Sequence, residues 1–166
     1  MLSTLFRRQP RNDVQPTAVA LPPETPYDPD LVSALCIEHR SLVMLLVKAS
    51  NAAQHQRYED IREILGEFKA DLRDHLKREG AELNPYLSAH LKGEDSRDAL
   101  KDMRNNSLHI ERAVEGLLKH YSQYPVNEKT VLRFEMELSG VIEEFSERLE
   151  REESSFYTLY LPRDSY

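Results

Sequence analysis

Four long segments of the chain repeat apolar side chains every three or four residues, and this spacing constrains the fold more than any other feature. The segments cover residues 28–56, 58–87, 97–121 and 127–160, with short polar connections between them. A helix with one apolar stripe is stable when that stripe packs against neighbouring helices. The sequence therefore predicts an all-α protein folded as an up-down-up-down four-helix bundle.

Local signals mark the ends of these helices. The first begins with Asp28-Pro29-Asp30, where an acid can cap the helix and proline suits the first helical position. Pro85 lies within the second segment and is expected to bend or end that helix, because it lacks a backbone N–H. Asn127 can cap the fourth helix.

Residues 1–27 differ from the rest of the chain. They hold five of the nine prolines and show no sustained periodicity. We expect an extended or disordered tail here, ahead of a bundle domain over residues 28–166. A sharper hypothesis is a docking strip, because Leu2, Leu5 and Phe6 come directly before two arginines.

Composition excludes several classes of protein. The net charge is −7, which argues against a basic nucleic-acid surface. No apolar run approaches the roughly 20 residues of a membrane span, and the first residues do not fit a secretory signal. The single cysteine, Cys36, cannot form an internal disulfide and fits a reducing compartment. We expect a cytoplasmic protein.

Each predicted helix places a polar residue in or beside its apolar stripe. His75 and Glu79 are one turn apart in the second helix, His39 lies in the first stripe and Glu152 in the fourth. His109 lies beside the third stripe. Each alone fits a hydrogen-bonded core residue, but together they predict one interior polar layer, where a metal ion or ion pairs would offset the cost of burial.

Two motifs carry a family resemblance. The runs HLKREGAELNPYL at 75–87 and RLEREESSFYTLY at 148–160, together with Glu38-His39 and His109, resemble the hemerythrin-like (HHE cation-binding) family. The resemblance covers residues 28–160. It implies a four-helix bundle around a non-haem di-iron centre with five histidines and two bridging carboxylates. It also implies a role in binding oxygen, in sensing oxygen, iron or redox state, or in handling iron.

The family's metal ligands map onto this chain position by position. The resemblance matches three of its five histidines and its second-helix carboxylate, and leaves the fourth-helix carboxylate open between two adjacent glutamates. The matching residues are His39, His75, Glu79, His109, and Glu152 or Glu153.

Two positions depart from the family pattern. Ala113 stands where the third helix should repeat its histidine, and Arg148 stands where the fourth-helix motif should open with one. Arginine stays protonated and offers no lone pair to a metal. In the family, these two positions and that of His109 serve the same iron, so the resemblance implies that half of the di-iron site is lost.

Two physical outcomes remain open. In one, the retained histidines and carboxylates hold a single iron or zinc ion, and Arg148 replaces the charge of the lost ion. In the other, no metal binds, and Arg148 bridges Glu79 and Glu152 in a buried ionic network. The second is favoured, since a buried cation at a ligand position repels another cation.

These residues suggest a non-enzymatic regulatory or signalling module that acts on an unidentified protein partner. The alternative is a sensor or store of oxygen, iron or redox state that uses one retained metal. No separate nucleophile, phosphate-binding loop or acid–base pair is visible, so we do not expect an enzyme.

Overall fold

The computed structural model describes residues 25–91, 93–162 and 165. Its helices are α1 (Leu31–Gln54), α2 (Tyr58–Arg78), α3 (Asn84–His90), α4 (Glu94–Gln123) and α5 (Val131–Arg151), with π-helical turns at Glu79–Leu83 and Glu152–Phe156 and a 3-10 turn at Tyr157–Leu159. The prediction of an extended tail falls almost wholly on residues 1–24, which lie outside the described residues. Within the described residues, no helix combines the length and the apolar character needed to cross a membrane.

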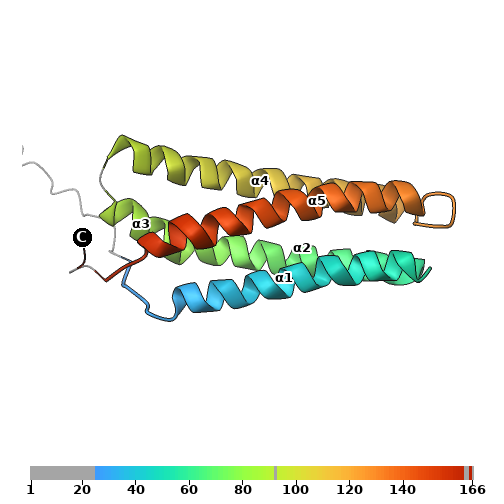
Figure 1. The fold of residues 1–166 in the computed structure, drawn as a ribbon, viewed down its shortest axis with the longest axis horizontal. Coiled ribbons are helices and arrows are strands. Elements are labelled where there is room, and N and C mark those ends of the chain that lie inside the picture. Colours follow the sequence, from blue (N-terminus) through green and yellow to red (C-terminus); the bar gives the residue numbers. More distant parts are fainter. Residues whose placement is uncertain (1–24, 92, 163–164, 166) are drawn as a thin grey trace, which may run out of the picture.

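Four helical rods run side by side, and consecutive rods are antiparallel (Figure 1). The second rod is formed by α2, a π turn and α3 in succession. Each rod packs against two others, since α1 contacts α2 and α5, and α4 contacts the same two helices. The predicted four-helix bundle is confirmed.

The helices begin and end a few residues from their predicted limits. Asp28 forms a turn ahead of α1 rather than capping the helix, because its Oδ1 accepts the Asp30 N–H at 2.9 Å. Asn127 likewise accepts the Lys129 N–H at 2.9 Å, and α5 begins only at Val131. Each acid or amide therefore stabilises the turn that precedes its helix.

Pro85 does not end the second rod, which continues to His90. The Asn84 N–H donates to the carbonyl of Glu79, five residues back, so the hydrogen-bond ladder has already shifted by one residue before the proline. Pro85 then lies at the start of α3, where its missing N–H costs little.

Two apolar clusters fill the interior. In the larger one Phe68 and Phe145 meet edge to face, with ring centroids 5.5 Å apart. The smaller one contains Tyr86 and Tyr160 at the end of the bundle where the described chain begins and ends. The Tyr160 hydroxyl accepts the Asp28 N–H at 2.9 Å. At the end of the last rod Leu159 is 39% exposed, because the 3-10 turn brings Tyr160 inward instead.

Candidate metal centre

Five polar side chains lie between the two apolar clusters. His39 comes from α1, His75 and Glu79 from the second rod, and Arg148 and Glu152 from the last rod. Each is only 1–3% exposed. The interior polar layer predicted from the sequence is therefore present, with side chains from three of the four rods.

Four of these residues could hold one metal ion. One donor atom from each of His39, His75, Glu79 and Glu152 lies within 4.8 Å of the others. The two Nε2 atoms are 3.2 Å apart, His39 Nε2 is 3.4 Å from Glu152 Oε2, and His75 Nε2 is 3.5 Å from Glu79 Oε1. Four donors at about 2.1 Å from one tetrahedral ion would be about 3.4 Å apart. These three separations therefore fit a single small ion.

The outer nitrogen of each imidazole contacts a carboxylate. His39 Nδ1 lies 2.8 Å from Glu153 Oε1, and His75 Nδ1 lies 2.9 Å from Glu38 Oε2. An ionised carboxylate can only accept, so each Nδ1 carries the hydrogen and donates it. In the neutral ring the lone pair then sits on Nε2, facing the centre, which is how metal-binding histidines are commonly oriented.

Arg148 joins the two buried carboxylates. Its Nη2 donates to Glu79 Oε2 at 2.8 Å and pairs with Glu152 Oε1. The other oxygen of each carboxylate is the one that faces an imidazole. The bridge predicted for Arg148 is present, and each carboxylate lies between the guanidinium and the imidazole pair.

Tyr157 closes the cluster on the remaining side. Its hydroxyl lies 3.0 Å from His39 Nε2 and 3.0 Å from Glu79 Oε1, and its ring stacks on that of His39. One hydroxyl hydrogen can serve only one of these acceptors at a time. Burial, and then the charge of Glu79, raise the pKa of Tyr157 far above its ordinary value, so the phenol stays protonated.

The neighbours of His75 and Glu79 shift both pKa values. Burial lowers the pKa of His75, but the hydrogen bond and charge of Glu79 and the hydrogen bond of Glu38 outweigh it, so the pKa lies above 6.5. Burial raises the pKa of Glu79, but the hydrogen bond of His75 and the charge of Arg148 bring it below 4.5. Both shifts favour the charged forms of this pair.

His109 does not join the cluster, although it was predicted as a ligand. Its side chain is 71% exposed, and Nδ1 lies 3.3 Å from Glu144 Oε2. Successive helical residues point about 100° apart, and its neighbour Ile110 is the one that is buried. Ala113, the other expected histidine position, only packs against the larger apolar cluster. Among the α4 side chains that the structure describes, none reaches the centre.

Glu152 rather than Glu153 faces the centre, because Glu152 lies one regular helical turn after Arg148. Glu152 is buried in the cluster, whereas Glu153 is 47% exposed and orients His39 from outside. Glu38 has the same role toward His75, and Arg78 holds Glu38 in place. No role was predicted for Glu38 or Tyr157 from the sequence, and their only signal was that both lie within the motifs that carry the resemblance.

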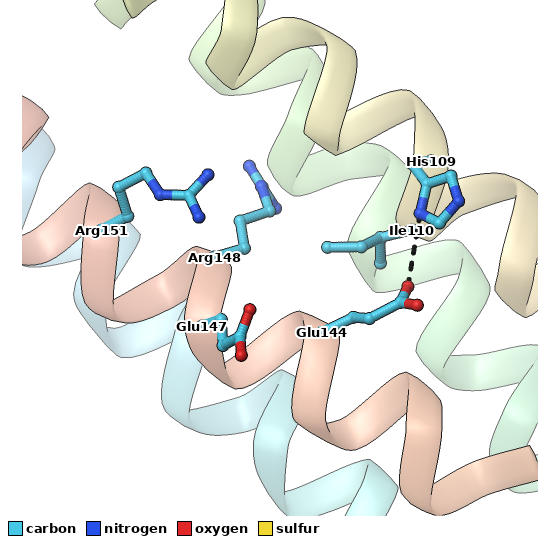
Figure 2. A pocket seen from close by; sticks show the side chains of 6 residues that line it. All are labelled: His109, Ile110, Glu144, Glu147, Arg148 and Arg151. Atoms are coloured by element: carbon cyan, nitrogen blue, oxygen red, sulfur yellow. Dashed lines mark ion pairs between the residues drawn. The ribbon is translucent and has the colours of Figure 1, made fainter.

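A cavity of about 110 Å³ lies beside Arg148 and opens between α4 and α5 (Figure 2). None of the four candidate ligands lines it. Its lining residues are His109, Ile110, Glu144, Glu147, Arg148 and Arg151.

Comparison with protein families gives one match. Residues 30–160 match the Hemerythrin HHE cation binding domain. Comparison with curated proteins and with solved structures gave no match. The match spans nearly all of the described bundle and includes every residue of the buried cluster. The chain therefore belongs to the hemerythrin HHE cation-binding domain family.

Proposed function

We propose that this protein is a non-enzymatic regulatory module whose buried cluster holds one divalent metal ion. His39, His75, Glu79 and Glu152 would be its ligands, and Arg148 would take the place of a second ion. The observation that carries this proposal is the arrangement of the two carboxylates, each with one oxygen toward an imidazole and the other on the guanidinium. Bound there, iron or zinc would supply positive charge and, for iron, redox chemistry.

The charges around the centre support a bound cation. Four carboxylates contact the imidazoles or Arg148, and two guanidinium groups contact the carboxylates. The carboxylates are those of Glu38, Glu79, Glu152 and Glu153, and the guanidinium groups are those of Arg78 and Arg148. Two negative charges remain, and either a divalent ion or two imidazole protons would neutralise them.

The seal around the centre supports a role without catalysis. All four candidate ligands are almost fully buried, and of the cluster residues only Arg148 lines the neighbouring cavity. A substrate would have to displace packed side chains to reach the ligand atoms. Metal occupancy can instead change the stability of the bundle, by linkage, and be read at the surface by a protein partner.

A metal-free ionic network is the second candidate, favoured by Arg148 and the His75–Glu79 pair. Arg148 already neutralises part of the charge on both buried carboxylates. The raised pKa of His75 provides a proton that could sit between the two Nε2 atoms. In this reading the same residues fix the register of the helices.

Thermal melting with metal and with chelator separates the two candidates. A metal present at about 100 times its Kd should stabilise the wild type by about 2.7 kcal/mol. The His75→Gln variant should lose this gain, while His109→Gln, which removes an exposed histidine outside the cluster, should keep it. The test uses Zn²⁺ in air and Fe²⁺ without oxygen. Equal melting of the wild type with metal and with chelator would favour the metal-free network.

A further inference from the structure

The hydroxyl oxygen of Tyr157 lies among the candidate metal ligands. It is 3.0 Å from His39 Nε2 and 3.0 Å from Glu79 Oε1, and these are the same two atoms that would bind the ion. The residue is only 5% exposed, so its hydroxyl has little access to bulk solvent. Tyr157 therefore presents a further oxygen to the centre of the cluster.

Both contacts have the length expected between neighbouring ligands of one ion. Two donors at about 2.1 Å from an ion are about 3.0 Å apart when the angle at the ion is about 90°, as it is in a five-coordinate site. The four other donor atoms lie within 4.8 Å of one another. The Tyr157 oxygen thus fits as a fifth donor beside His39 and Glu79.

Two other buried tyrosines use their hydroxyl groups differently. The Tyr86 hydroxyl donates to the carbonyl of Leu161 at 2.6 Å, and the Tyr160 hydroxyl accepts the Asp28 N–H at 2.9 Å. In each of these bonds the hydroxyl pairs with a backbone group and holds the end of the bundle together. The Tyr157 hydroxyl contacts side chains of the candidate site instead.

The charge of the cluster indicates when a fifth ligand would bind. With neutral imidazoles and a protonated phenol, four carboxylates and two guanidinium groups leave two negative charges. A ferrous ion neutralises them, whereas a ferric ion would leave one positive charge buried. A phenolate would supply the missing negative charge. Ligands that bind a metal as anions lose their proton when it binds.

We propose that Tyr157 becomes an iron ligand when the bound iron is oxidised, so that the centre responds to redox state. One electron passes from ferrous iron to a one-electron acceptor. The O–H bond of Tyr157 breaks, its proton passes to the buffer, and an Fe–O bond forms. Zinc stays divalent and four-coordinate, so it would leave this hydroxyl protonated. The inference rests on the metal function proposed above and specifies the signal that the module would read.

Visible absorption and resonance Raman spectra of the iron-loaded protein test this step. A phenolate bound to ferric iron absorbs visible light by charge transfer, and ferrous iron beside a phenol does not. The protein is loaded with Fe²⁺ without oxygen, its iron is counted by elemental analysis, and stoichiometric ferricyanide then takes the electron. The wild type should gain a visible band on oxidation and lose it on reduction. Raman excitation in this band should show tyrosine ring modes that shift when the tyrosines are ring-deuterated.

Two matched variants assign the band. Tyr157→Phe should keep one iron per chain and lose the band completely, because the four other ligands remain. Tyr160→Phe removes the hydroxyl of a tyrosine that is also 5% exposed, and it should keep both iron and band. If Tyr157→Phe fails to fold or to hold iron, the Raman spectrum of the wild type decides alone.

The outcomes separate this inference from the metal function on which it rests. Oxidised iron without tyrosine ring modes in the wild type, or an unchanged band in Tyr157→Phe, would overturn the role of Tyr157 and leave the metal function standing. A wild type that retains no iron would overturn both.

Discussion

At the scale of single residues, the cluster depends on which atom of each side chain faces the centre. Glu38 and Glu153 each accept a hydrogen bond from the Nδ1 of one imidazole, so both Nε2 atoms point inward. The buried carboxylates divide their oxygens between the imidazoles and Arg148. Arg148 is therefore the side chain that offsets the negative charge of both buried carboxylates.

Replacing Arg148 by methionine should destabilise the protein strongly. The change leaves Glu79 and Glu152 buried without their cation, and breaking a buried pair in this way costs about 3–5 kcal/mol. Urea unfolding of the metal-free protein at neutral pH measures the loss. Arg151→Met, at an exposed position one turn away from the cluster, should change the free energy of unfolding by no more than about 0.5 kcal/mol. Similar losses in both variants would contradict this account of Arg148.

The pH dependence of the metal-free protein should reflect His75 and Glu79. A pKa raised on folding gives stability that is present below 6.5 and is lost as the pH rises through the folded-state pKa of His75. A lowered pKa gives stability that is present above 4.5 and is lost as the pH falls through that of Glu79. The contribution of the pair should thus be fully present between pH 4.5 and 6.5.

Urea unfolding with chelator at about pH 5.5 and about pH 8.5 checks the alkaline side of this prediction. The wild type should be less stable at the higher pH by more than the His75→Gln variant is. The same slope in both proteins would show that His75 does not carry the effect.

The identities of the central residues could be predicted from the sequence, but not all of their roles. His39, His75, Glu79 and Glu152 follow from polar residues that interrupt apolar stripes. His109 was misplaced because a residue beside the stripe points about 100° away from its buried neighbour. The hydrogen bond that Tyr157 makes to the centre depends on helix rotation, which spacing alone does not fix.

At the scale of elements, both candidate carboxylate ligands begin a π turn. Glu79 begins the turn Glu79–Leu83, and Glu152 begins the turn Glu152–Phe156. Each turn holds an extra residue, which shifts the stripe that follows it. Such insertions are frequent at functional sites. The apolar stripes predicted the helices well. The π turns could not be predicted, because the spacing of apolar residues does not show where a hydrogen bond spans five residues instead of four.

Glycine substitutions should separate helix propensity from turn geometry. Gly66 lies within α2, and a methyl group there would meet nothing within 4 Å. Gly66→Ala should raise the free energy of unfolding by about 0.4–1 kcal/mol, because it restricts the unfolded chain. Gly93, with φ of 121°, precedes α4 in a conformation that alanine rarely adopts, so Gly93→Ala should lower it. Chemical unfolding compares the pair, and a gain in both would contradict the turn argument.

At the scale of the whole molecule, the polar layer lies between two apolar clusters that seal it from both ends. A metal ion bound in this layer would contact three rods at once, so its binding energy would add to the stability of the entire bundle. The overall fold was predictable because four stripes and short connections admit few arrangements. Metal occupancy was not predictable from the sequence. It depends on which carboxylate oxygens of Glu79 and Glu152 pair with Arg148 and which remain for an ion.

The number of metal ions per chain tests the central claim most directly. The purified protein is loaded with excess Fe²⁺ without oxygen, freed of unbound metal by gel filtration, and measured by elemental analysis. One ion per chain is the expected result, with retention lost in His75→Gln and kept in His109→Gln. Two ions per chain would contradict the replacement of one ion by Arg148, and none would contradict metal binding at this centre.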